Sequence, residues 1–232
     1  MHTEHDYRRI DSSDLSSTCL AELTQGQQHP LWFSAVDFSE QDLSRINLSG
    51  ARFERCLFAG TNLTAAQLDA TEWLNCKAAH AVFRASTLVD ARFVGSDLNN
   101  TRWQHSKLAH ASFTGCKLTG ANFADAATLG LNFSDCVLRS ASLSGMSFYK
   151  SQLHSLDFAE ADLSYCDFRH AVFVEAGSLS LARVNNARFD HADLREASLD
   201  GLRLVDAKLF KGATISKSQA AMLLSGLGLT VR

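Results

Sequence analysis

The sequence predicts an all-β fold, a four-sided β-solenoid of about nine coils, and three periodic features predict it. Large apolar residues recur every five residues, small residues precede them by two positions, and aromatic residues recur every 20 residues. A period of five fits neither an amphipathic helix nor an uninterrupted strand, because it sends successive apolar side chains to different sides of both. The backbone that fits this period is a series of short strands joined by corners, and units of this kind stack as a solenoid.

The five-residue repeat is counted from position i, the large apolar residue of each block. Stepping by five from Phe33 to Phe173 gives 29 positions, of which 27 hold Phe, Leu or Trp; the exceptions are Ala78 and Thr128. After Phe173 the register slips by one residue, and seven further positions continue to Leu209, which makes 36 repeats. Position i−2 is usually small or apolar, and position i−1 is usually polar.

The geometry of one block follows from strand alternation. If i−2, i−1 and i are extended, the side chains of i−2 and i point to one side of the chain and that of i−1 to the other. Positions i+1 and i+2 then turn a corner before the next short strand. Each block therefore contributes two inward residues, which pack against neighbouring coils, and three outward ones.

The number of blocks in a coil comes from the 20-residue period. Eight positions i spaced by 20 from Phe33 to Phe173 are aromatic in seven cases, against eight of the other 21 positions up to Phe173. A 15-residue step produces no such column, so four blocks form a coil and 36 blocks form nine coils. The predicted core ladder comprises Phe33, Phe53, Trp73, Phe93, Phe113, Phe133 and Phe173.

The predicted organisation has three parts: an N-terminal segment or cap at 1–30, the repeat region at 31–211, and a cap at 212–232. The open ends of a solenoid expose unpaired strand edges, so both ends need covers. Residues 13–23 (SDLSSTCLAEL) fit either a short helix or an irregular cap.

The C-terminal part predicts a short α-helix and a final strand. The helix begins at Ser216 or Ser218 and ends at Gly226 or Gly228, and LTVR at 229–232 is the strand.

Composition limits the classes of partner. The 232 residues carry a formal net charge of −3, with acidic and basic residues interspersed. Direct nucleic-acid binding is disfavoured, since it usually requires a clustered Lys/Arg face. No apolar run has membrane-spanning length, so no membrane partner is expected. The polar N-terminus, MHTEHDYRRIDSSDL, lacks a hydrophobic signal segment, so we expect a cytoplasmic protein.

Residue types that carry chemistry have simpler structural interpretations. Five of the six cysteines occupy position i−2 and no CxxC spacing occurs, so we expect buried thiols, although stacked pairs such as Cys56 and Cys76 are close enough to bridge in principle. No HExxH or GxSxG motif occurs, and a solenoid filled with side chains offers no pocket. We therefore predict no catalytic residues, no metal, no cofactor and no enzymatic activity. Leu179 follows Phe173 by six residues instead of five, and the extra residue within 174–178 is either a bulge that bends the rod or aims a contact, or an inert corner insertion.

The blocks ARFVG, SDLNN, ANFAD, ADLSY and ADLRE resemble the A(D/N)LXX consensus of the pentapeptide-repeat family, and the resemblance covers Leu31 to about Lys211. It implies a right-handed, four-sided β-helix. The tail SQAAMLLSGLGLTV resembles the C-terminal segment of the gyrase-protecting members, which include the Qnr-type quinolone-resistance proteins and the albicidin and microcin immunity proteins. In those proteins this segment forms the dimer contact. The resemblance therefore implies a homodimer through Met222, Leu223, Leu224, Leu227 and Leu229.

The gyrase-protecting relatives imply the function. We expect a non-catalytic, DNA-mimicking rod that binds DNA gyrase or a related type II topoisomerase and protects it from an inhibitor, as antibiotic resistance or self-immunity. The alternative is a structural or regulatory scaffold that binds another protein through its flat β walls. A continuous negative stripe on the surface supports mimicry, whereas a neutral checkerboard favours the scaffold.

Overall fold

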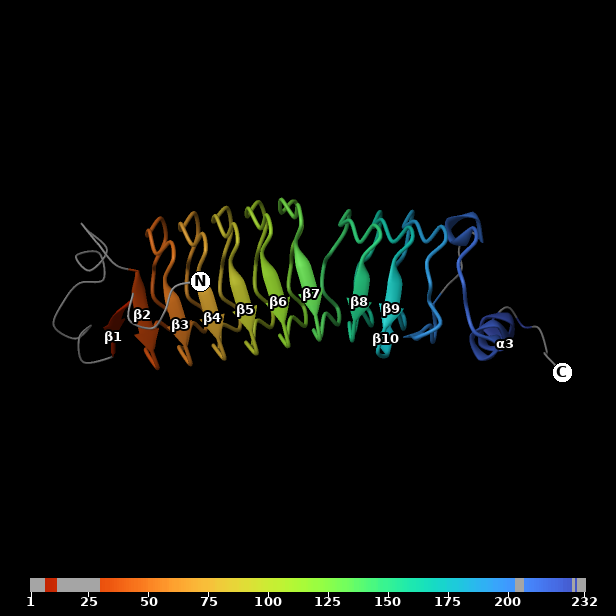
Figure 1. Ribbon diagram of the computed structural model, residues 1–232, viewed down its shortest axis with the longest axis horizontal. Helices are drawn as coiled ribbons and strands as arrows, with labels where there is room; N and C mark the ends of the chain where they lie inside the picture. The colour runs from red at the N-terminus through yellow and green to blue at the C-terminus, as the bar shows by residue number, and fades with distance from the viewer. Residues whose placement is uncertain (1–6, 12–29, 203–206, 227, 229–232) are drawn as a thin grey trace. The chain divides into compact units, whose positions relative to one another are not determined.

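The computed structural model describes residues 7–11, 30–202, 207–226 and 228. These residues form a parallel β-solenoid of about nine coils with one short C-terminal helix, which confirms the predicted fold class (Figure 1). The chain divides into two compact units, 1–132 and 133–232, and each is described by itself. The division falls inside the predicted repeat region, and both units are built from the same five-residue blocks.

The first unit contains six parallel strands that follow one another in chain order. Partner residues from β2 onward are 20 positions apart, so Phe33 lies beside Phe53, Phe53 beside Trp73 and Trp73 beside Phe93. A seventh strand, β7 (Asn132–Ser134), spans the boundary between the units. The six are β1 (Arg8–Ile10), β2 (Leu31–Ser34), β3 (Arg52–Glu54), β4 (Glu72–Leu74), β5 (Arg92–Val94) and β6 (Ser112–Thr114).

The second unit continues the same architecture. Strand β8 (Gln152–His154) pairs in parallel with β9 (Val172–Val174), and β10 (Gly177–Ser178) pairs in parallel with β11 (Ala197–Ser198). The 3₁₀-helix η2 (Ala207–Phe210) and the α-helix α3 (Lys217–Gly226) complete it.

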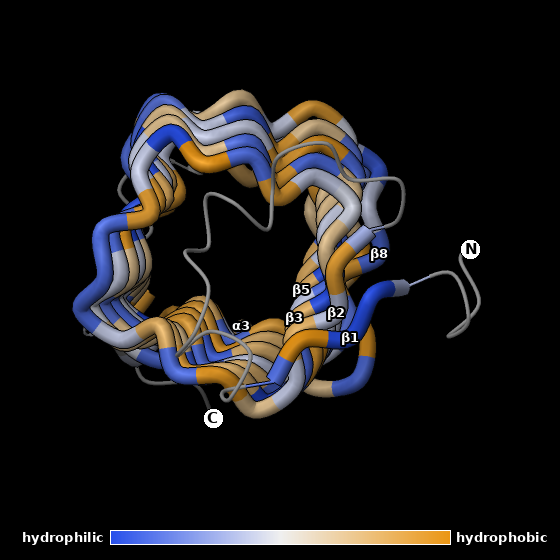
Figure 2. The backbone as a smooth tube through the Cα atoms, turned by 90° about the vertical axis from the view of Figure 1, so that its left-hand side faces the viewer, coloured by the Kyte–Doolittle hydropathy of each residue, from blue (hydrophilic) through white to orange (hydrophobic). Residues whose placement is uncertain are grey.

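Each coil has four sides, which we number by their first inward residues: side 1 from Phe33, side 2 from Phe38, side 3 from Leu43 and side 4 from Leu48. Figure 2 looks along the coils from the N-terminal end and shows the four-sided cross-section. Side 1 carries strands β2 to β9 and side 2 carries the short strands β10 and β11, while sides 2 to 4 otherwise pair through single parallel bridges such as Asp37 to Leu57.

The corners lie at i+1 and i+2, as the sequence predicts. Residues at i+2 adopt left-handed backbone angles, with φ of 55° at Ala35, 58° at Glu40 and 61° at Arg45. The amide of most such residues donates to the next coil, as from Ala35 N to Glu54 O at 2.8 Å. On side 1 the strand extends through i+1, so that corner is formed at i+2 alone.

The interior of the first unit is filled by stacked rings. On side 1, Phe93 lies between Trp73 and Phe113, with ring centroids 5.3 Å and 4.7 Å away and planes within 18°. The ladder residues Phe33, Phe53, Trp73, Phe93 and Phe113 are each 0% exposed. Burial of such side chains contributes roughly 1.5 to 3 kcal/mol each before chain entropy is subtracted.

The second unit stacks its rings on another side. Its side 1 contains Phe133 and Phe173, 4% and 2% exposed, with Leu153 between them. The continuous stack is on side 4, where consecutive rings lie 4.7 to 4.8 Å apart with planes within 12°. It comprises Phe148, Phe168, Phe189 and Phe210.

This side 4 stack corrects the predicted register near the C-terminus. The sequence repeat places Leu209 at position i, but Phe189 N donates to Leu209 O at 2.7 Å, which is the bond made to i−1 of the next coil elsewhere. Phe210 is thus the inward residue, and Leu209 lies in the 3₁₀-helix η2. Ring stacking on Phe189 favours this register, because a leucine there would lose the aromatic contact.

The six-residue block after Phe173 is absorbed in a corner. Glu175 and Ala176 both take left-handed φ angles, 59° and 65°, and pairing resumes with Ser178 beside Asp157. Position i−2 of the next block is Gly177, where an added Cβ would lie 2.6 Å from Phe173 Cδ1. Of the two alternatives, the structure therefore shows a corner insertion.

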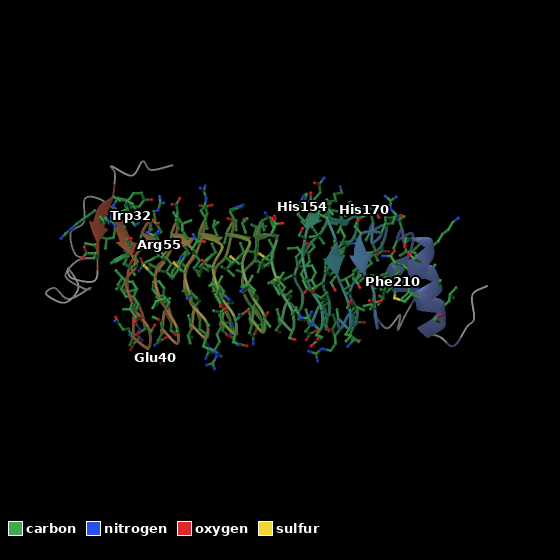
Figure 3. The ribbon with its side chains drawn as sticks, turned by 90° about the horizontal axis from the view of Figure 1, so that it is seen from below. Trp32, Glu40, Arg55, His154, His170 and Phe210 are labelled. Carbon is green, nitrogen blue, oxygen red and sulfur yellow. The ribbon has the colours of Figure 1, made fainter. Side chains whose placement is uncertain are left out.

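The first coil is covered by β1, a strand that the repeat pattern does not predict. It pairs in parallel with β2, and Ile10, beside Phe33, is 1% exposed. On the outer face of these strands, the ring of Trp32, which Figure 3 labels, lies between the side chains of Arg9 and Arg52. Their guanidinium carbons are 5.2 Å and 5.1 Å from the ring centroid. Residues 13–23, for which the sequence allowed a helix or an irregular cap, lie outside the described residues.

Candidate protein-binding surfaces

The outward surface of the first unit is an electrostatic checkerboard. On side 2, the i−1 positions of five consecutive coils are Asp37, Leu57, Lys77, Asp97 and Lys117. In the coils from 31 to 130, acidic and basic residues differ by one on every side. The described residues of this unit therefore form no continuous negative stripe, which is the feature that would support DNA mimicry.

The second unit separates its charges by side. Among its described residues, the outward positions of sides 1 and 2 carry seven carboxylates and two arginines. The arginines are Arg139 and Arg195, and the carboxylates are Asp135, Asp157, Glu160, Glu175, Asp193, Glu196 and Asp200.

Three of those carboxylates form an acidic edge, the shared corner of sides 1 and 2. Asp135, Glu175 and Glu196 occupy this corner in three of four successive coils, with Ser155 in the remaining one. Neighbouring coils are about 4.8 Å apart, as in any sheet. The edge therefore presents a row of negative charge about 14 Å long.

The two arginines neutralise only part of this surface. Arg195 forms a bidentate pair with Asp193, and hydrogen bonding to Arg195 lowers the pKa of Asp193 below its usual value. Arg139 contacts Glu160 at 3.0 Å and Asp157 at 3.6 Å.

Helix α3 is fixed to the end of the coils by one polar side chain. Ser216 and Gln219 form a capping box, in which Gln219 N donates to Ser216 Oγ at 3.2 Å and Ser216 N donates to Gln219 Oε1 at 2.6 Å. The Gln219 amide also donates to Leu194 O and Ala197 O, each at 2.7 Å, and the residue is only 9% exposed. It satisfies carbonyl groups on the last coil that would otherwise face an open sheet edge.

The predicted dimer residues lie on and after this helix. Met222 and Leu223 are half-buried and Leu224 is 38% exposed, while Leu227 and Leu229 lie outside the described residues. The helix begins at Lys217, between the two predicted starts at Ser216 and Ser218, and ends at Gly226, one of the two predicted ends, the other being Gly228.

The five described cysteines are buried thiols inside the coils. Burial raises the pKa of Cys166 to about 12, and hydrogen bonding to Cys56 together with burial raises the pKa of Cys76. Since the thiolate is the nucleophile and the metal ligand, Cys166 and Cys76 are unreactive at neutral pH, whereas hydrogen bonding to Cys76 lowers the pKa of the buried Cys56. Among residues 7–11, 30–202, 207–226 and 228, no three His, Cys, Asp or Glu side chains are grouped as metal ligands.

Sequence profiles establish the class of protein. The profile described as "Pentapeptide repeat region" matches residues 29–103 and 71–139, and "Pentapeptide repeats (8 copies)" matches 132–169, 151–177 and 178–211. The chain belongs to the pentapeptide-repeat family. No curated protein matches it in sequence.

The chain is similar to solved structures of QnrB1, described as a plasmid-mediated fluoroquinolone resistance protein. Full-length QnrB1 matches with a TM-score of 0.74 and 22% identity, over 85% of this chain and 100% of that one. A trypsin-treated variant of QnrB1 matches with a TM-score of 0.72 and 22% identity, over 85% and 99% of the two chains. At this identity the likeness shows the fold. Within the described parts of the chain, no helix combines the length and hydrophobicity needed to cross a bilayer.

Proposed function

We propose that this protein is a non-catalytic inhibitor-protection factor that binds DNA gyrase or a related type II topoisomerase in place of DNA. The acidic surface of sides 1 and 2 in the second unit carries the proposal. Its fold likeness to a fluoroquinolone resistance protein and the resemblance of its tail to gyrase-protecting proteins support the choice of partner.

The acidic surface suits a protein that normally binds a duplex. An enzyme that holds DNA does so with cationic side chains that neutralise phosphates. A rigid row of carboxylates can engage the same cations, and the acidic edge of Asp135, Glu175 and Glu196 provides such a row. The coils beneath it are tied by backbone hydrogen bonds of 2.7 to 3.1 Å, such as Gly177 N to Glu196 O at 3.0 Å, so little ordering is needed on binding.

The proposed assembly is a dimer through the C-terminal segment. Gln219 holds one face of α3 on the coils, and Met222, Leu223 and Leu224 retain exposed apolar surface on this short helix. A second copy could bury that surface together with Leu227 and Leu229. Leu223→Asp should therefore halve the mass measured by light scattering, and an unchanged mass would restrict α3 to the role of a cap.

The decisive experiment is a gyrase supercoiling assay with a panel of inhibitors and increasing amounts of this protein. We expect rescue of supercoiling with inhibitor present, or depressed supercoiling without inhibitor at high concentration. The absence of both effects across the panel contradicts the proposal.

A matched pair of variants tests the acidic edge in the same assay. Glu175→Lys with Glu196→Lys should weaken the effect about tenfold or more, because two carboxylates in a row of three are reversed. Glu40→Lys with Asp90→Lys makes the same change in net charge at i+2 corner positions on sides 2 and 4 of the first unit and should have little effect. Equal loss in both would show that net charge alone matters.

A second candidate function rests on the first unit. Its neutral checkerboard favours a scaffold that binds a protein other than a topoisomerase. This candidate gains support if calorimetry with purified gyrase detects no binding, and loses it if binding is measured and the acidic-edge variant abolishes it.

A further inference from the structure

Side 4 of the second unit has the opposite electrostatic character from sides 1 and 2. Its outward positions carry four cations and two carboxylates. The carboxylates are Asp167 and Asp190, and the cations are Lys150, Arg169, Arg188 and Lys211. This side thus has a net positive charge, with the histidines counted as neutral.

The carboxylates on this side hold two arginines in place. Arg169 Nε and Nη2 bind the two oxygens of Asp167 at 2.8 Å and 2.6 Å, and this interaction lowers the pKa of Asp167. Arg188 Nε donates to Asp190 at 3.3 Å. The net charge of side 4 therefore comes from Lys150 and Lys211, with ordered guanidinium groups in the coils between them.

Aromatic and imidazole rings continue this surface. The Tyr149 ring is 44% exposed and lies 5.1 Å from Lys150 Nζ and 5.2 Å from the guanidinium carbon of Arg169. His170 meets Tyr149 edge to face, with centroids 6.0 Å apart, and stacks on His191 at 5.2 Å and 13° (Figure 3). We call Tyr149, Lys150, Arg169, His170, Arg188, His191 and Lys211 the basic surface.

The inner side of this wall makes the surface rigid. Directly behind it is the stack of Phe148, Phe168, Phe189 and Phe210, whose rings are nearly parallel. The outward residues are thus presented from a packed wall, which reduces the entropy lost on binding. The first unit has no such counterpart among its described residues, because its side 4 carries two carboxylates and one lysine.

We propose that the basic surface binds an acidic polypeptide segment of a partner protein. Complementary charge would attract the segment, and Tyr149 and the stacked imidazoles would contact its apolar atoms. An acidic α-helix repeats its carboxylates at about 5.4 Å per turn, close to the roughly 4.8 Å between coils, and flexible Lys and Arg side chains absorb the difference.

The interspersed carboxylates favour a polypeptide over a nucleic acid. A phosphodiester strand carries about one charge per 3.4 Å, so it would bring phosphates close to Asp167 and Asp190 wherever it lay along this wall. A polypeptide can place carboxylates over the cations and neutral residues over Asp167 and Asp190. The inference does not depend on the topoisomerase, since it concerns a different side and a different sign of charge.

Fluorescence anisotropy with the full chain tests the inference. The probes are a labelled 15-residue peptide rich in Glu, its Gln counterpart, and a single-stranded oligothymidine of equal length. We expect the Glu peptide alone to bind at low salt, with binding that falls steeply as salt rises, because exposed charges are screened. Equal binding of the Gln peptide, tighter binding of the oligonucleotide, or no binding of the Glu peptide overturns the proposal.

Charge-matched variants locate the surface. Lys150→Glu with Lys211→Glu should weaken Glu-peptide binding about tenfold or more. Arg139→Glu with Arg183→Glu produces the same change in net charge on sides 2 and 3 and should weaken it by less than about threefold. If the two variants lose equal affinity, the basic surface is not the site. Circular dichroism confirms folding of both, and Lys150→Gln with Lys211→Gln repeats the test if the reversal variant does not fold.

Discussion

Replacing Gln219 with leucine should release α3 from the last coil while leaving the coils folded. The Gln219 side chain donates to Leu194 O and Ala197 O and accepts from Ser216 N. Leucine has similar size but no polar atoms, so all three hydrogen bonds disappear. The Ala197 carbonyl group would then lie unpaired under an apolar side chain, whereas Leu194 O would keep its hydrogen bond from Ala197 N at 2.9 Å.

The expected loss in the docking free energy of α3 follows from those hydrogen bonds. A typical hydrogen bond contributes about 0.5 to 1.5 kcal/mol net, an unsatisfied buried group costs about 1 to 3 kcal/mol, and a lost cap costs roughly 1 kcal/mol. Together these favour a loss of about 2 to 4 kcal/mol in the docking of α3. The loss cannot exceed the docking free energy itself, because an undocked helix returns the carbonyl groups to water.

Native-state hydrogen exchange measures this docking directly. Amides of α3 in Gln219→Leu should exchange about 30- to 700-fold faster than in the wild type, since each 1.4 kcal/mol is a factor of ten. Amides on β8 and β9 should be unchanged. Gln152→Leu is the control, because Gln152 is an exposed glutamine of the same unit. Unaltered exchange of α3 in Gln219→Leu would refute the claim that this amide holds the helix.

Three further predictions test the core, the thiols and one ion pair. Phe93→Ala should lower the free energy of unfolding by about 3 to 5 kcal/mol, and Phe93→Leu by less, because both lose the ring stack but only alanine leaves a large cavity; urea titration measures both. Cys166, with its pKa of about 12, should resist iodoacetamide at pH 8 in the native state and react once urea unfolds the chain; native labelling would contradict the buried placement. Asp167 has a folded pKa below its unfolded value, so its stabilisation is complete above the unfolded pKa and is lost as the pH falls through the folded one. Asp167→Asn should therefore lower the free energy of unfolding by about 0.2 to 1 kcal/mol at pH 7. This difference from the wild type should disappear at acidic pH. A difference that does not change with pH would show that the ionised carboxylate contributes nothing.

The sequence was informative wherever one residue type recurs at one position. Each coil repeats the same environment, so the burial of Phe33 and of Phe113 could be inferred from a single rule. The positions of the corners were equally predictable, since a four-sided coil must turn once in every block, at i+1 and i+2. A repeat in effect supplies many observations of one structural position.

Features that occur once could not be obtained in this way. Strand β1 has no five-residue pattern, so its pairing with β2 could not be inferred from the repeat. Gln219 resembles any polar helix residue until the carbonyl groups of the last coil are placed beside it. The inward placement of Phe210 depends on a second one-residue shift, which the recurrence of Phe at 148, 168, 189 and 210 could have indicated.

The separation of charge in the second unit was also missed, because net charge and linear interspersion average over all sides. Assigning each residue to a side first would have revealed it. Asp135, Glu175 and Glu196 are 40 and 21 residues apart in sequence yet share one corner. Residues that are about one coil period apart in sequence are neighbours on the surface, so the acidic edge becomes visible only when the chain is divided into coils.

The corners have an evolutionary consequence. A left-handed angle costs a non-glycine residue about 1 to 2 kcal/mol, yet Lys150, Glu160 and His170 all adopt it, because a hydrogen bond from the backbone amide to the next coil fixes the backbone there. Since that bond is indifferent to the side chain, mutation can exchange a lysine for a glutamate at a corner without altering the wall behind it. Such a lineage could acquire new partners rapidly by drift at its corners, while the inward residues continue to be selected for packing alone.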